Sequence, residues 1–93
     1  MYRLDLADAA TCVRIYVENH EIGSKEIREL FGPIGASTVS KLKKDALELM
    51  TQRNVIRFAS HKVNTEVAFE AWGIDIADLK RRLKELQKLG LAT

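Results

Sequence analysis

The side chains of this sequence that could do chemistry are mainly cations, and they gather in its middle third. Residues 37–62 carry a net charge of +4, whereas residues 1–36 carry −2 and residues 63–93 carry none. A local basic patch on a nearly neutral protein suits a surface that faces a polyanion. A solvated, lysine-rich helix face gives the same pattern. The cations of the patch are Lys41, Lys43, Lys44, Arg53, Arg57 and Lys62.

The residue types that usually carry catalysis or hold metals are not arranged for either task. His20 and His61 lie far apart, and neither has a cysteine, histidine or carboxylate at a metal-ligand spacing. The turn at residues 32–35, with sequence GPIG, lacks the lysine and the hydroxyl residue of a phosphate-binding loop. We therefore expect no enzyme activity, no metal ion and no small-molecule cofactor.

The length of 93 residues suits a single domain spanning residues 1–93. Cys12 is the sole cysteine, so it forms no internal disulfide, and we expect it to be a small buried apolar residue. Its isolation fits a reducing cytoplasm. No apolar run approaches the length of a membrane helix, about 18 residues, and the N-terminus lacks the apolar stretch of a signal peptide. We expect a cytoplasmic protein with no membrane partner.

Apolar periodicity and capping residues predict an all-α fold of four or five helices. The first helix is expected to start at Asp5 and to end near residues 19–21, with one apolar face. A short second helix follows from Ser24 to Phe31, ended by Gly32, and a third from Ser37 to about Met50, with serine as the cap of each. The expected face of the first helix is Leu6, Ala9, Ala10, Val13, Tyr16 and Val17. The expected buried stripe of the third is Val39, Leu42, Ala46, Leu49 and Met50.

The stretch between residues 53 and 73 has two interpretations. Alternation of apolar residues from Val55 to Phe69 would form a small β-hairpin, the wing of a winged helix. The favoured interpretation is instead a helix capped by Asn64, running to Trp72 and stopped by Gly73.

Residues 24–44, with sequence SKEIRELFGPIGASTVSKLKK, hold the pattern on which the functional prediction depends. Apolar residues and one turn glycine recur there at set positions, namely Ile27, Leu30, Gly32, Ile34, Val39 and Leu42. At these positions the sequence resembles the helix-turn-helix superfamily of DNA-binding proteins. In that superfamily two short helices cross at a steep angle, and the second enters the major groove. The run from Thr38 to Lys41 is also similar to the start of many recognition helices.

The resemblance covers about 27 of the 93 residues and has three departures. Ile27 and Val39 lie one residue further apart than is usual, Pro33 is placed like an insertion in the turn, and Arg28 stands where alanine is common. The chain also has a weak resemblance to small regulators and small terminase subunits of phages and mobile elements. These features leave the subfamily unresolved.

The resemblance implies sequence-specific binding of duplex DNA, in transcription regulation or in a phage-like DNA transaction. It implies base contacts from residues on the exposed side of the third helix, namely Ser40, Lys41 and Lys44. It implies phosphate contacts from Lys25, Arg28, Ser37, Lys43 and Arg53.

The last helix is expected from Ile76 to Leu89, capped by Asp75, within a C-terminal amphipathic segment at residues 75–89. Its apolar residues have heptad spacing and form a seam of Trp72, Ile76, Leu79, Leu83 and Leu86. This seam either packs on the domain's own core or joins two copies in a homodimer. An alternative function follows, a small helical protein-interaction module that uses this seam and does not bind DNA.

Overall fold

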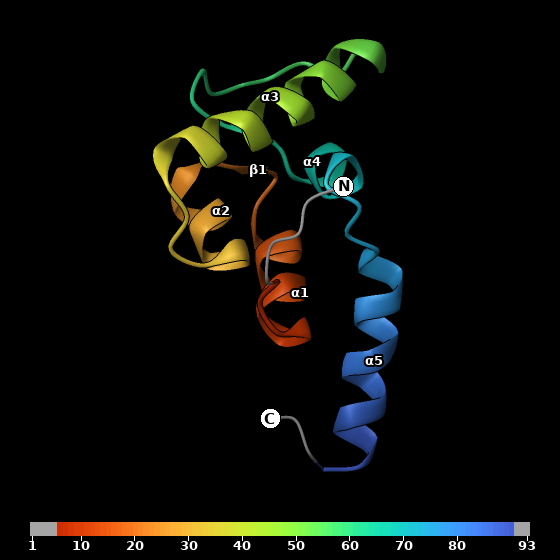
Figure 1. Cartoon of the computed structure of the whole chain (residues 1–93). Helices are drawn as coiled ribbons and strands as arrows, with labels where there is room; N and C mark the ends of the chain where they lie inside the picture. The colour runs from red at the N-terminus through yellow and green to blue at the C-terminus, as the bar shows by residue number, and fades with distance from the viewer. Residues whose placement is uncertain (1–5, 91–93) are drawn as a thin grey trace.

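The computed structural model describes residues 6–90, and this part of the chain is mostly helical. Five helices surround a small core, and two short strands form an antiparallel sheet (Figure 1). In chain order the elements are α1 (Ala9–Glu18), β1 (Glu21–Ile22), α2 (Ser24–Phe31), α3 (Ala36–Gln52), β2 (Val63–Asn64), α4 (Thr65–Ala71) and α5 (Ile76–Lys88). The prediction of a mainly helical fold is confirmed, although the sheet departs from an all-α expectation.

Helix α1 begins later than predicted and buries a different face. Asp8 caps it by accepting a hydrogen bond from the Thr11 N–H at 2.8 Å, and the predicted start at Asp5 lies outside the described residues. Its buried residues are Cys12 and Ile15, whereas Val17 is 67% exposed. The predicted face is therefore wrong in part: Val17 is exposed, whereas Tyr16 is half-buried and packs against the core. Because α1 carries apolar residues on more than one side, helical spacing alone did not identify the side that meets the core. The burial of Cys12 is confirmed.

The sheet joins the segment just before α2 to the segment just before α4. Strands β1 and β2 pair with Glu21 opposite Asn64 and Ile22 opposite Val63. No strand lies between residues 53 and 62. The alternative hairpin within residues 55–69 is therefore not formed, since β2 pairs with a strand that precedes α2.

The helix predicted at residues 64–72 is confirmed. The Asn64 side chain caps α4 by accepting from the Val67 N–H at 2.9 Å, and Gly73 follows its end with a φ of 73°. Trp72, the first residue of the expected seam, is 6% exposed and donates from Nε1 to the carbonyl oxygen of Leu42 at 2.8 Å. This bond fastens the end of α4 to the middle of α3.

Helix α5 begins as predicted, with the Asp75 carboxylate accepting from the Asp78 N–H at 3.0 Å. It packs against α1 and extends beyond it (Figure 1). Only the first part of the predicted seam meets the core, through Ile76 and Leu79. Leu83 is half-buried and Leu86 is 39% exposed. The seam therefore divides into a half that belongs to the domain's own core and a half that reaches into solvent.

Candidate nucleic-acid interface

The connection between α2 and α3 is a tight four-residue turn that holds the two helices together. Gly32 ends α2 with a φ of 84°, a backbone conformation that residues other than glycine rarely adopt. The Ile34 N–H donates to the Gly32 carbonyl at 2.8 Å, which folds the chain around Pro33. The apolar residues on both sides of the turn are buried as predicted, namely Ile27, Leu30, Phe31, Val39 and Leu42.

Helix α3 starts one residue before the predicted cap. Gly35 is its N-cap and Ala36 its first residue, so Ser37 lies exposed in the first turn and does not cap the helix. Both Gly35 and Ser37 are residues that occur at N-caps. The predicted role of Ser37 as a cap is wrong, and its position at the exposed start of α3 leaves its hydroxyl on the surface.

The predicted base-contacting residues lie together on the exposed side of α3. At about 100° per residue, Ser37, Ser40, Lys41 and Lys44 fall within about 100° of arc. Val39, Leu42 and Ala46 occupy the opposite side and are buried. Glu48 continues the same exposed stripe toward the C-terminus. The stripe is therefore basic only in the first half of the helix.

The predicted phosphate-contacting residues are more scattered. Lys25 and Arg28 are exposed on α2, and Arg28 Nε donates to the Ile34 carbonyl at 3.4 Å. Lys43 is half-buried on the flank of α3, away from the stripe. The guanidinium of Arg53 forms a two-pronged ion pair with Glu70 and thereby lowers the pKa of that carboxyl. Arg53 therefore already has an acidic partner within the chain.

Sequence analysis placed Arg57 and Lys62 in the basic patch but assigned the loop at residues 53–62 no DNA contact other than Arg53. The loop leaves α3 where Asn54 adopts a φ of 55°, and it carries Arg57 and Lys62. Neither cation forms an ion pair with any residue in the described range 6–90. The ten residues include no acidic side chain, and that feature of the sequence could have identified the loop.

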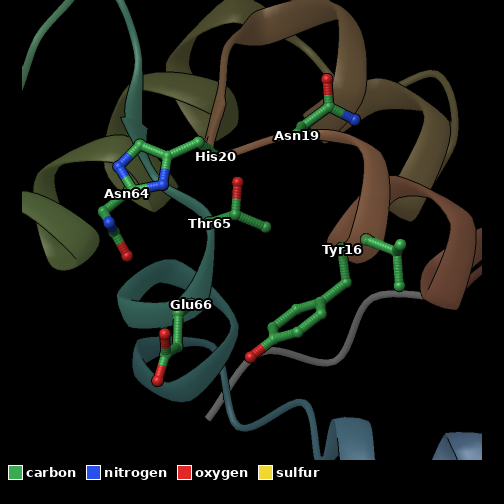
Figure 2. Close-up of a pocket in the computed structure, with 7 residues that line it drawn as sticks. Tyr16, Asn19, His20, Asn64, Thr65 and Glu66 are labelled. Atoms are coloured by element: carbon green, nitrogen blue, oxygen red, sulfur yellow. The ribbon is translucent and has the colours of Figure 1, made fainter.

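A separate cavity lies between the end of α1 and the start of α4, with a volume of about 250 Å³. Figure 2 shows Tyr16, His20, Thr65 and Glu66 around it. Thr65 is 2% exposed, and its Oγ1 has no hydrogen-bond partner in the described part of the chain. Across residues 6–90, no three histidine, cysteine or carboxylate side chains come together as a metal site would require.

Comparison with known proteins gives no match: no family model, no curated protein and no solved structure is similar enough to the chain to count as a relative. Among the described residues, no helix combines the length and the apolar character needed to cross a lipid bilayer.

Proposed function

We propose that this chain binds duplex DNA through α2 and α3, which act as a helix-turn-helix. The single observation that carries the proposal is the exposed stripe at the start of α3. It presents Ser40, Lys41 and Lys44 outward, while the opposite side of the same helix is buried in the core, where α3 packs mainly against α4. Lysine can donate to guanine O6 and N7 in the major groove, and serine can donate or accept.

The packing around the turn supports this function because it fixes how far α3 projects. Ile27 and Leu30 of α2 are fully buried against the same core as Leu42 of α3. The bond from Trp72 holds α3 from its other side. A recognition helix must be held rigidly for its side chains to meet base edges in register. Lys25, Arg28 and Lys43 are proposed phosphate contacts, and Ser37 is a fourth at the N-terminus of α3.

A titration of random-sequence duplex at two salt concentrations tests this function. With four to six phosphates neutralised, affinity should fall by about three to five decades for each decade of salt. Competition by duplex pools of differing sequence then tests specificity. Absence of duplex binding at low salt would contradict the proposal.

The second candidate is a protein-interaction surface on the outer half of α5, with a second copy of the chain as its partner. Leu83 and Leu86 lie in the outer half of the seam, and Leu89 beyond them is 71% exposed. Trp72, which was part of the expected seam, is buried and so does not contribute. Paired copies would also supply two recognition helices, as many helix-turn-helix proteins require.

Analytical ultracentrifugation across a concentration series, with Leu83→Glu beside the wild type, tests the homodimer. A wild type that dimerises and a variant that remains monomeric but folded would support it. A wild type that stays monomeric to high micromolar concentration would contradict the proposed homodimer.

A further inference from the structure

The loop at residues 53–62 combines positive charge with the most exposed large apolar side chains of the described chain. Phe58 is 77% exposed and Ile56 is 75% exposed, and Arg57 stands between them. The segment sums to a net charge of +3 in the sequence; Glu70 pairs with Arg53, whereas Arg57 and Lys62 have no ion pair in the described range 6–90. Two large, exposed apolar side chains beside a cation form the kind of surface that can contact a partner.

The backbone of the loop is anchored, although it forms no helix or strand. The Glu21 carboxylate accepts from the N–H groups of Phe58 at 2.6 Å and Ala59 at 3.0 Å. The Val55 N–H donates to the Met50 carbonyl at 2.9 Å where the loop leaves α3. The ring of His20 lies 5.7 Å from the ring of Phe58. The exposed side chains are therefore presented by a fixed support, which reduces the entropy lost on binding.

The loop lies on the side of the molecule formed by α3, away from the free end of α5 (Figure 1). It begins directly after α3, and β2 at its other end packs against the same helix. From the C-terminal end of α3 the loop runs back along that helix (Figure 1), and Phe58 and Ala59 are bonded to Glu21 of β1. The loop therefore lies beside the helix that carries the proposed base contacts.

We propose that this loop is a second DNA contact, which enters a minor groove adjacent to the major groove occupied by α3. Phe58 and Ile56 act as an apolar wedge between base pairs, and Arg57 and Lys62 contact the flanking phosphates. Apolar wedges of this kind unstack a base step and kink the duplex. The net positive charge favours a polyanionic partner over a neutral protein surface. The inference rests on the proposed function, since it assigns the loop to the same DNA-bound complex.

The test measures DNA affinity and DNA bending with the full chain and a short duplex labelled at both ends for energy transfer. The wild type should shorten the end-to-end distance of the duplex on binding. Phe58→Ala should abolish that shortening and weaken binding by about five- to one-hundred-fold, the range for loss of one base-stacking contact. Its salt dependence should not change, because no charge is removed. Arg57→Ala should instead reduce the magnitude of the salt slope by about 1.

Val17→Ala is the matched control, because Val17 is 67% exposed on α1 and outside the loop. It should leave affinity and bending unchanged, and thermal melting of all variants should match the wild type because the changed side chains are exposed. Wild-type binding without bending, together with full affinity in Phe58→Ala, would overturn the loop contact and leave the proposed function intact. Failure of the wild type to bind any duplex would overturn both.

Discussion

Replacement of Trp72 by phenylalanine tests whether one side chain holds α3 in place. The indole lies at the junction of three helices: its Nε1 donates to Leu42 of α3, and its ring meets the ring of Phe31 edge-on at 5.6 Å. Phenylalanine keeps an aromatic ring but removes the donor and part of the buried surface. Because a carbonyl within a helix also accepts a bond from the fourth residue along, Leu42 does not become an orphaned acceptor.

The expected cost follows from these two losses. A neutral hydrogen bond contributes about 0.5–1.5 kcal/mol net, and the smaller ring removes apolar contacts worth about 1 kcal/mol. We expect Trp72→Phe to lower the free energy of unfolding by about 2 kcal/mol, which corresponds to about 8–16 °C in melting temperature for a domain of this size. Trp72→Ala should cost about 3–5 kcal/mol.

Urea and thermal unfolding, followed by far-ultraviolet circular dichroism, measure this cost. Phe58→Leu is the control, because Phe58 is an exposed aromatic and its change should cost less than about 0.5 kcal/mol. A cost below about 0.5 kcal/mol for Trp72→Phe would mean that the indole does not fasten α4 to α3. Tryptophan fluorescence is unsuitable because Trp72 is the only tryptophan.

Three further predictions concern other parts of the fold. Val39→Ala should cost about 1–3 kcal/mol and Lys44→Ala less than about 0.5 kcal/mol in urea unfolding, and the reverse order would invert the assigned faces of α3. Thr65→Val should preserve or raise the melting temperature, because it removes a buried hydroxyl without a described partner; a clear decrease would show that the hydroxyl is bonded in solution. Hydrogen bonds from Thr11 lower the pKa of Asp8, so its capping contributes stability at neutral pH that is lost as pH falls through the folded-state pKa. Asp8→Asn should therefore lose less melting temperature than the wild type on acidification, and equal losses would contradict this role.

The helical elements with strong capping residues could be predicted from the sequence. The side chains of Asn64 and Asp75 accept hydrogen bonds from N–H groups in the first turns of α4 and α5. Gly73 follows the end of α4 with a positive φ. Each of these effects is local, so the sequence indicates it. The buried side of α3 was identified correctly at Val39 and Leu42 because polar residues leave it only one apolar stripe.

The elements that depend on distant contacts could not be predicted in this way. Strands β1 and β2 have two residues each, and their pairing joins segments more than forty residues apart, so no local periodicity indicates them. The support of the 53–62 loop by Glu21 spans 37 residues and likewise leaves no local signal. In the candidate interface, the stripe of Ser40, Lys41 and Lys44 followed from helical spacing, whereas the pairing of Arg53 with Glu70 required the tertiary fold.

The salt dependence of duplex binding by the wild type and by a Lys41→Gln, Lys44→Gln double variant tests the role of α3 most directly. Glutamine keeps a polar, helix-compatible side chain and removes only the charge. The wild type should show a slope of about −3 to −5 in log affinity against log salt, and the double variant should bind more weakly with a slope smaller in magnitude by up to about 2. Equal affinities and equal slopes for the two proteins would contradict DNA recognition by this helix.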